Sequence, residues 1–427
     1  MAISTPRRRR SWQLFALVPI LAAGGCSPPA PEVQVPDVIV EDSLGVQIVE
    51  NHAPVWDTAE PWTVDPEPEF ILGGHSATAN DSSHLVWQIT AAAPLSDGRV
   101  VLLAPSGDRK VLVFERSGAL STSFVRAGEG PGEHDYPRHL QVLPGDTIVL
   151  WGLGFGRISH YDPAGNLLQE RRIDARSVVD AVRTSDEAPG ESVYLPLPDG
   201  SFLLRLARPN WRRPTTAGTI FRHPRGYVRI DSAYSVHSFG WWGGEEVLAT
   251  EGGYWYMLPF QANSIAVGAD TPPQVYITNA DRHEVHQFSA NGVLKRIFRR
   301  FVDSIPITDG QIEDYIDRLL SLNGWDRAAV PVPEFPRRHH PAIHDLLVDA
   351  EGNLWTLDTR DIQRQLSEWS IFNPEGRWLG TLAVPAEIVR WIGNDLLLAS
   401  NYDHDIGVET VEGYRLNRPR RVPGNDS

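Results

Sequence analysis

The chain has 427 residues, of which 41% are hydrophobic, and its formal net charge at pH 7 is −15. This composition is typical of a folded globular protein and excludes a largely disordered one. The negative charge disfavours nucleic acids and anionic lipid headgroups as binding partners.

Residues 1–25 are predicted to be a lipoprotein signal peptide. A cationic stretch at residues 7–10 precedes an apolar stretch at residues 12–24, which is shorter than the roughly 20 residues that a transmembrane helix needs. Small residues then lead to Cys26, the only cysteine, so no intrachain disulfide can form. The segment AGGC (23–26) resembles a bacterial lipobox, although alanine stands where that motif usually has leucine.

The lipobox resemblance implies that Cys26 becomes a lipidated N-terminus that anchors the chain to a membrane of the cell envelope. Cleavage would remove four arginines and no acids, which changes the formal net charge from −15 to about −19. Because Ser27 rather than aspartate follows the cysteine, analogy with Gram-negative sorting favours the outer membrane facing the periplasm over the inner membrane. Residues 26–45 are proline-rich and acidic, and we expect an extended tether there, then a folded region at 46–418 and a flexible tail at 419–427.

Six short apolar runs recur in the folded region, and each follows a turn signal. The runs are RVVLLA (99–104), TIVLWG (147–152), SFLLRLA (201–207), QVYITNA (274–280), NLWTLDT (353–359) and DLLLASN (395–401). A second turn signal, ending in glycine, follows each run by roughly twenty residues. These glycines are Gly118, Gly165, Gly226, Gly292, Gly376 and Gly413. Continuous apolar runs indicate strands buried on both faces, so each unit is predicted to be a strand–turn–strand element packed between two others.

Together the six units predict an all-β fold, a six-bladed β-propeller, because radial repetition leaves only short, protected sheet edges. A β-sandwich or a pair of barrels is the alternative fold. Strands in those folds would alternate more clearly between apolar and polar residues, and they would not require six matched pairs of turns.

Residues 128–168 resemble an NHL-type repeat, which places glycines, a proline, a turn, a strand and an arginine in a set order. The loop residues and the arginine that carry this resemblance are Gly128, Gly130, Pro131, Gly132, Glu133 and Arg157. More broadly, residues 46–418 resemble bacterial six-bladed propeller lipoproteins, which share a VEN strand (49–51 here), a tryptophan soon after it and a GxGPGE loop. The resemblance implies the fold and says little about activity, because propellers host unrelated functions.

The glycine loop is predicted to connect two blades rather than to bind a phosphate. Glu129 and Glu133 flank the glycines, and a predicted strand follows. A phosphate-binding loop needs instead a helix N-terminus or a nest of amides with a basic residue nearby. Glu133 is expected to cap the loop or to bridge to a neighbouring blade.

One helix interrupts the β pattern at about residues 308–322. Apolar residues there recur at helical spacing, and Thr308 with Gln311 forms a predicted capping box. The apolar stripe either packs on the flank or end of the propeller or covers one mouth of its channel as a lid. Both alternatives are open at this point.

The sequence contains no recognisable catalytic set, and no cofactor is expected. His339, His340 and His344, with Asp345 beside them, are the best candidates for a metal such as zinc, because imidazole and carboxylate are suitable ligand types. Pro341 interrupts the group and argues against a pair on one helix face. A structural or solvated role is the alternative.

Two pairs of aspartates invite comparison with calcium sites. They are Asp358 with Asp361, and Asp403 with Asp405. Calcium takes six to eight oxygen ligands, and two carboxylates in a loop supply few of them. Ordinary solvated polarity at strand ends is therefore the favoured interpretation.

Trp241 and Trp242 stand between glycines in GWWGGEE (240–246) and are candidate aromatics of a binding surface. Exposed aromatic rings can stack on sugars or anchor a protein partner. Wedges in the core between blades are the competing interpretation for both residues.

Two functional hypotheses follow. The first is a lipid-anchored, extracytoplasmic propeller that acts as a non-catalytic binding scaffold for an envelope protein, a peptide or a glycan. The alternative is a lyase or hydrolase that uses the propeller channel, as in NHL-like lyases and strictosidine-synthase-like proteins. In this chain its candidate residues are His339, His340 and His344.

Overall fold

The structure is a computed structural model with a short N-terminal unit, Met1–Pro36, and a compact unit, Asp37–Ser427. The described residues are 36–74, 86–152, 157–172, 188–197, 199, 201–207, 214–231, 233–250, 255–270, 273–323, 338–361, 364–403 and 407–419. Cys26 and the predicted signal peptide lie outside them. The helices and strands of the described residues all belong to the second unit.

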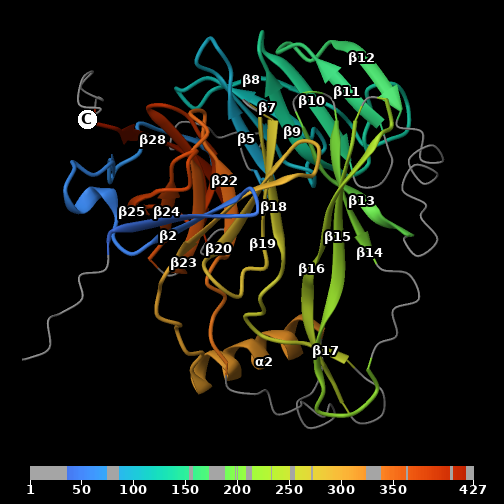
Figure 1. The fold of residues 1–427 in the computed structure, drawn as a ribbon. Helices are drawn as coiled ribbons and strands as arrows, with labels where there is room; N and C mark the ends of the chain where they lie inside the picture. The colour runs from blue at the N-terminus through green and yellow to red at the C-terminus, as the bar shows by residue number, and fades with distance from the viewer. Residues whose placement is uncertain are drawn as a thin grey trace, which may run out of the picture. The chain divides into compact units, whose positions relative to one another are not determined.

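The described strands form six sheets of four to six strands, numbered here in chain order (Figure 1). Sheet 1 contains β5 (Ala91–Pro94), β6 (Val100–Leu103), β7 (Val111–Phe114) and β8 (Leu120–Phe124), and sheet 2 contains β9 (Pro137–Leu143), β10 (Thr147–Gly152), β11 (Arg157–Tyr161) and β12 (Leu167–Arg172). Sheet 3 contains β13 (Ala188–Pro196), β14 (Phe202–Ala207), β15 (Ile220–Ile230), β16 (Val236–Ala249) and β17 (Trp255–Met257).

The other three sheets follow the same antiparallel plan. Sheet 4 contains β18 (Ile265–Asp270), β19 (Pro273–Thr278), β20 (Glu284–Ser289) and β21 (Leu294–Arg300), and it also takes in β1 (Val38–Ser43) and β2 (Val46–Asn51). Sheet 5 contains β22 (Asp345–Val348), β23 (Leu354–Asp361), β24 (Leu366–Phe372) and β25 (Trp378–Val384). Sheet 6 contains β26 (Ile388–Ile392), β27 (Leu396–Asp403) and β28 (Val408–Asn417), with β3 (Thr63–Val64) and β4 (Phe70–Gly73) paired to β28.

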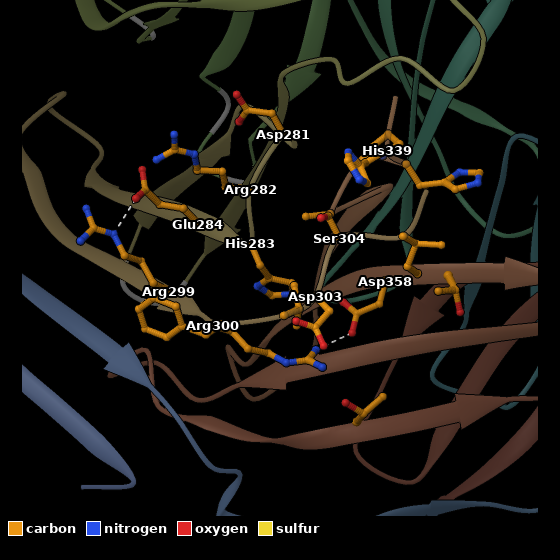
Figure 2. Close-up of a pocket in the computed structure, with 18 of the residues that line it drawn as sticks. Asp281, Arg282, His283, Glu284, Arg299, Arg300, Asp303, Ser304, His339 and Asp358 are labelled. Carbon is orange, nitrogen blue, oxygen red and sulfur yellow. Dashed lines mark hydrogen bonds and ion pairs between the residues drawn. The ribbon is translucent and has the colours of Figure 1, made fainter. Parts of the chain in front are cut away.

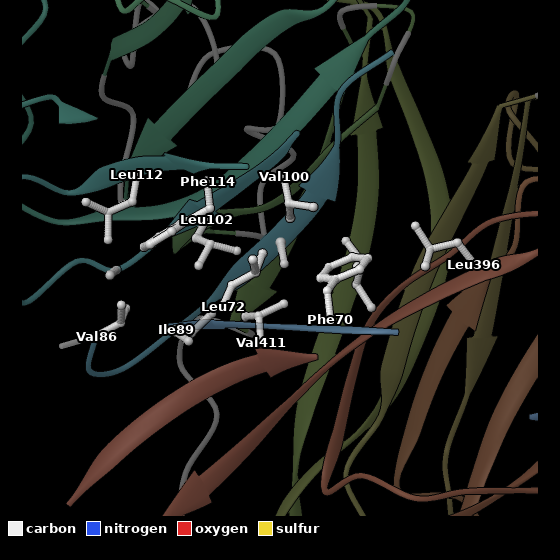
Figure 3. Packing of buried hydrophobic residues seen from close by; sticks show 13 residues of the cluster. Phe70, Leu72, Val86, Ile89, Val100, Leu102, Leu112, Phe114, Leu396 and Val411 are labelled. Atoms are coloured by element: carbon white, nitrogen blue, oxygen red, sulfur yellow. The ribbon is translucent and has the colours of Figure 1, made fainter. Parts of the chain in front are cut away.

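Each sheet packs on the next through an apolar cluster to which both contribute. The clusters join, in order, Val113 with Leu150, Trp151 with Leu204, Tyr227 with Ile277, Phe298 with Phe372, Trp369 with Leu397, and Leu398 with Leu102. The last cluster, in which Phe70 and Leu72 of β4 also lie, joins sheet 6 back to sheet 1 (Figure 3). The packing is therefore cyclic, as in a β-propeller, and the predicted all-β class is confirmed.

The six predicted apolar runs coincide with the second strand of each sheet, β6, β10, β14, β19, β23 and β27. Four of the glycine turns are present, with positive φ angles at Gly118, Gly165, Gly292 and Gly376. The other two turn predictions are wrong. Gly226 lies inside β15, where a Cβ would come within 3.3 Å of the Trp241 ring, and Gly413 lies inside β28 against the ring of Phe70. At these two positions glycine admits an aromatic ring instead of a turn.

The expected tether is too long at its C-terminal end, because residues 38–43 form β1 within sheet 4. β1 pairs antiparallel with β2, and β2 pairs parallel with β21. The apolar residues of VIVEDS and VQIVEN can join an open edge of a sheet, so the fold begins at Asp37 instead of residue 46.

Beyond β2, the N-terminal segment follows the edges of sheets 5 and 6. The 3₁₀ helix η1 (Val55–Asp57) contacts β25, and β3 and β4 pair with the C-terminal strand β28. Trp56 packs against Trp62, which in turn packs against the buried Trp355. Two strands from the N-terminal part of the chain, β3 and β4, and the C-terminal strand β28 therefore meet in sheet 6 and complete it.

The predicted helix is present as α2 (Asp309–Asn323). The capping box is formed, because Gln311 N–H donates to Thr308 Oγ1 at 3.3 Å and Thr308 N–H donates to Gln311 Oε1 at 2.9 Å. Ile316 and Leu320 pack against Leu248 of β16, where β15 and β16 extend toward the helix (Figure 1). These contacts agree with the alternative in which the apolar stripe of the helix packs on the flank or end of the propeller. No helix among the described residues has the length and apolarity of a membrane span.

Candidate binding site

A cavity of about 960 Å³ lies at the junction of sheets 4 and 5 (Figure 2). Sheet 4 contributes the β19–β20 turn and the end of β21, and sheet 5 contributes the ends of β23 and β24 and part of β25. The remaining wall comes from residues 301–305 and 339–342, at the two ends of the connection between the sheets.

A short ladder holds the two ends of this connection together. Ile307 N–H donates to the Arg338 carbonyl and His340 N–H donates to the Ile305 carbonyl, both at 2.8 Å. Pro306 and His339 form the bridge between them. The excursion that carries α2 is therefore closed at its base, and the base forms one side of the cavity.

A buried polar group forms the inner wall of the cavity around Asp358. His283 is 4% exposed, and its Nε2 lies 3.1 Å from Asp358 Oδ1. Arg300 Nη1 donates to Asp358 Oδ2 at 2.6 Å, and Ser370 Oγ donates to the same oxygen at 2.7 Å. Burial alone would raise the pKa of Asp358, but these hydrogen bonds and the positive charge of Arg300 hold it below its ordinary value. Asp358 is thus an ionised carboxylate with both oxygens occupied.

A second network surrounds Arg299 at the edge of the cavity. Its guanidinium lies 2.6 Å from Glu284 and 3.2 Å from Glu50. Glu284 also contacts His286 Nε2 at 2.8 Å. The hydrogen bond from His286 and the one from Arg299 lower the pKa of Glu284 to about 2. These charges neutralise one another within the wall.

Four polar side chains of the cavity have no hydrogen-bond or ion-pair partner among the described residues. They are Arg282, Asp303, Ser304 and His339, and all four are exposed. Figure 2 shows Arg282 beside the β19–β20 turn and His339 on the opposite wall. These groups are available to a ligand, in contrast to the buried set around Asp358.

The three histidines proposed for a metal are not gathered into one site. His339 and His340 line the cavity, whereas His344 does not, and the rings of His340 and His344 are 6.5 Å apart. Desolvation by the surrounding protein lowers the pKa of His344 to about 4, although the residue is exposed to solvent. His340 Nε2 lies 3.4 Å from Gln311 Oε1. Within the described residues, no group of three or more metal-ligating side chains has the placement of a metal site.

The aspartates considered for calcium are otherwise engaged or lie outside the described side chains. Asp358 is taken by Arg300 and His283, and Asp361 lies 3.6 Å from Arg364. The side chain of Asp403 and the whole of Asp405 are outside the part of the chain that the structure describes.

The glycine loop connects β8 of sheet 1 to β9 of sheet 2. Glu133 accepts a hydrogen bond from Gly130 N–H at 3.0 Å. Arg157 donates to the carbonyl of Glu133 at 3.1 Å and also to the carbonyls of Glu129 and Gly130. The geometry is that of a structural connection in which one arginine binds three carbonyls and the Tyr161 hydroxyl donates to a fourth, that of Gly132, at 2.9 Å.

The two tryptophans behave differently. Trp242 donates from Nε1 to the Phe239 carbonyl at 2.9 Å, and its ring packs edge-on against Phe288, 6.2 Å away. Trp242 thus belongs to the packing between sheets 3 and 4, which corrects its assignment as a surface aromatic. Trp241 is 38% exposed and lies against Gly226.

Comparisons with known proteins find only distant structural similarity. No protein-family model and no curated protein matches the chain. Among solved structures, a member of the DUF4221 family from Bacteroides vulgatus is similar, with 10% identity, coverage of 84% of this chain and 99% of that chain, and a TM-score of 0.47. Virginiamycin B lyase from Staphylococcus aureus has 10% identity, coverage of 84% and 100%, and a TM-score of 0.36. A gluconolactonase from Xanthomonas campestris has 13% identity, coverage of 84% and 98%, and a TM-score of 0.36. With TM-scores below 0.5, these similarities support no conclusion about activity or ligand.

Proposed function

We propose that this chain is a lipid-anchored, extracytoplasmic six-bladed β-propeller of the NHL-like type that binds a protein, a peptide or a glycan without catalysing a reaction. The cyclic packing of six sheets supports the blade count. The lipobox-like segment at Cys26 supports the anchor, and Ser27 supports the outer membrane as its location.

One observation supports the binding role, namely the difference between the inner polar groups of the cavity and its exposed polar groups. The groups that resemble catalytic machinery, His283, Asp358 and Ser370, are bonded to one another or to Arg300. His283 and Ser370 are buried, and the side chain of Asp358 is 15% exposed. In contrast, the four exposed groups Arg282, Asp303, Ser304 and His339 are unpartnered among the described residues and include a positive and a negative charge, which suits ligand recognition. A rigid, satisfied wall that presents a few open polar groups is suited to binding.

The enzyme alternative has one observation in its favour. A carboxylate that contacts a histidine, as Asp358 contacts His283, can also orient the imidazole to accept a proton from a substrate. A lyase or a hydrolase would need that imidazole at the reacting atom, so His283→Gln would abolish turnover. In a scaffold the same substitution would leave a bound ligand chemically unchanged.

The decisive experiment is a binding screen with the mature chain carrying Cys26→Ser, against a glycan array and a phage-displayed random peptide library. We expect a ligand whose affinity falls at least tenfold in Arg282→Ala and in Asp303→Ala. The matched controls are Arg126→Ala and Asp135→Ala, which remove exposed charges from the connection between sheets 1 and 2. Equal effects of cavity and control variants, or chemical conversion of the ligand, would overturn the proposal.

The anchor is tested separately. Cells fed radiolabelled palmitate should label the wild-type chain but not Cys26→Ala, because the lipid is attached to that thiol. Only residues 27–37 separate Cys26 from Val38, so the start of β1 would lie within roughly 43 Å of the membrane. Equal labelling of both chains would remove the anchor from the proposal.

A further inference from the structure

We infer that the ligand of the cavity is an extended peptide segment that pairs, as an added β-strand, with the backbone of residues 302–304. This inference rests on the proposed binding function and specifies the class of ligand. It starts from the backbone of the segment that leaves sheet 4.

The backbone of residues 302–304 is open. β21 ends at Arg300, which is its last residue paired with β2 and whose N–H donates to the His283 carbonyl at 3.0 Å. Pairing resumes at Ile305, whose carbonyl accepts from His340 N–H. Between the ladder and Ile305, residues 302–304 make no backbone hydrogen bond to any described residue. All three are exposed.

Open amides and carbonyls beside a cavity favour a peptide as the occupant. A row of unpaired backbone groups that continues directly from a strand can accept another strand. Because both ends of the row are held by hydrogen bonds, the segment is positioned before a ligand arrives, which reduces the entropy lost on binding. A glycan has no regular series of donors and acceptors that would match a backbone.

The side chains of the same segment indicate apolar residues in the peptide. Phe301 is 62% exposed, Val302 is 41% exposed and Ile305 is 51% exposed. The ring of Phe301 stacks on His52 at 4.8 Å, so one of its faces is already covered. Valine and isoleucine offer no flat face for a sugar to stack on, whereas they bury apolar side chains of a peptide well.

The charges at the cavity specify one further group. Arg282 and His339 lie on separate walls and have no charged partner among the described residues. A carboxylate of the peptide, from a side chain or from its C-terminus, would form an ion pair with the guanidinium of Arg282. The recognised segment is therefore extended and rich in apolar residues, with one carboxylate.

The test uses twelve-residue peptides selected from a phage-displayed random library on the mature chain carrying Cys26→Ser. Fluorescence anisotropy then measures their affinity. Phe301→Ala and Val302→Asp should each weaken binding at least tenfold. Tyr136→Ala and Val293→Asp are the matched controls, since these side chains are 72% and 52% exposed elsewhere, and they should change affinity less than twofold.

Two measurements distinguish strand pairing from other modes of peptide binding. N-methylation of the peptide should weaken binding at every second residue, because only alternate amides face the neighbouring strand. Hydrogen exchange of residues 302–304 should be fast in the free protein and at least tenfold slower with peptide. N-methylation tolerated at every position, or no added protection at 302–304, would overturn the inference.

The failures of the two proposals are separable. Glycans that bind in an Arg282-dependent manner, with no peptide selected, would overturn the peptide inference and leave the binding function intact. Absence of any ligand sensitive to Arg282→Ala or Asp303→Ala in both screens would overturn both. Circular dichroism and thermal unfolding of each variant show that a loss of affinity is not a loss of fold.

Discussion

Two connections between neighbouring sheets differ sharply, although both carry the chain from the last strand of one sheet to the first strand of the next. The connection from sheet 1 to sheet 2, residues 125–136, is short and closed by Arg157, which binds three of its carbonyls. The connection from sheet 4 to sheet 5, residues 301–344, carries a helix, borders the cavity and exposes backbone at 302–304. The first maintains the fold, and we assign the ligand to the second.

Of the two connections, the structural one, residues 125–136, has the more distinctive sequence. A tight crossing with several turns needs glycine at positive φ, as at Gly128 and Gly132, and a donor for the carbonyls that the turns direct inward. These demands produce a motif. An open connection has no such demands on its backbone, so its residues form no recognisable pattern.

Arg157→Ala gives the largest expected effect. The side chain is 12% exposed, and its removal takes a charged donor from the carbonyls of Glu129, Gly130 and Glu133, of which Gly130 keeps the N–H of Glu133 at 3.0 Å. We expect the free energy of unfolding to fall by about 3 kcal/mol, as for the loss of several charged hydrogen bonds. Denaturant unfolding measures the loss, with Arg126→Ala as the control at about 0.5 kcal/mol or less. A loss no greater than that of the control would show that the arginine does not hold the connection.

His134 gives the next largest effect, and it depends on pH. The residue is 6% exposed with Nε2 at 2.9 Å from Ser159 Oγ, and burial, together with the charge of Arg157, lowers its pKa to about 4. The unfolded chain takes up a proton near pH 6.5, whereas the folded chain does not until about pH 4. Stability contributed by the neutral imidazole is therefore complete above pH 6.5 and is lost as pH falls toward 4.

We expect this loss to reach about 2 kcal/mol at pH 4 relative to His134→Gln, which retains a hydrogen-bonding side chain but does not titrate. Urea unfolding of both proteins at pH 7.5, 5.5 and 4 measures the difference. Other buried histidines contribute equally to the two proteins and cancel. A difference that stays constant with pH would show that His134 is not held neutral by the fold.

Gly128→Ala and Gly145→Ala form a matched pair. Both glycines have positive φ, at 147° and 84°, but a Cβ at Gly145 would meet open space, while one at Gly128 would meet the Glu133 carboxylate. The clash would displace that carboxylate from Gly130 N–H. We expect Gly128→Ala to cost about 1 kcal/mol more than Gly145→Ala in thermal unfolding. Equal costs would mean that Glu133 moves without penalty.

The sequence alone predicted the features that depend on neighbouring residues. The second strand of each sheet, four of six glycine turns and the capping box at Thr308 follow from local patterns, and the structure confirms them. Gly226 and Gly413 were misassigned because a glycine that admits an aromatic ring has the same sequence signature as a glycine in a turn.

The cavity could not be predicted from local patterns. His283 and Asp358 are 75 residues apart in the chain and meet only because sheets 4 and 5 pack together. The pairing of β2 with β21 is likewise a contact between distant segments, and β1, which lies in the expected tether, joins the sheet by pairing with β2. Neither contact leaves a periodicity or a motif in the residues on either side.

Thr308→Ala gives the smallest expected effect, and it is confined to the open connection. Its hydroxyl accepts from Gln311 N–H and supports the first turn of α2, which packs, among the described residues, against the extended end of sheet 3. The cap should therefore contribute roughly 0.5 kcal/mol to the helix and little to global stability. Hydrogen exchange should accelerate in α2 and stay unchanged in sheet 1, with Ser321→Ala, near the other end of the helix, as the control. Faster exchange in sheet 1 as well would mean that the open connection is as firmly integrated into the fold as the one that Arg157 closes.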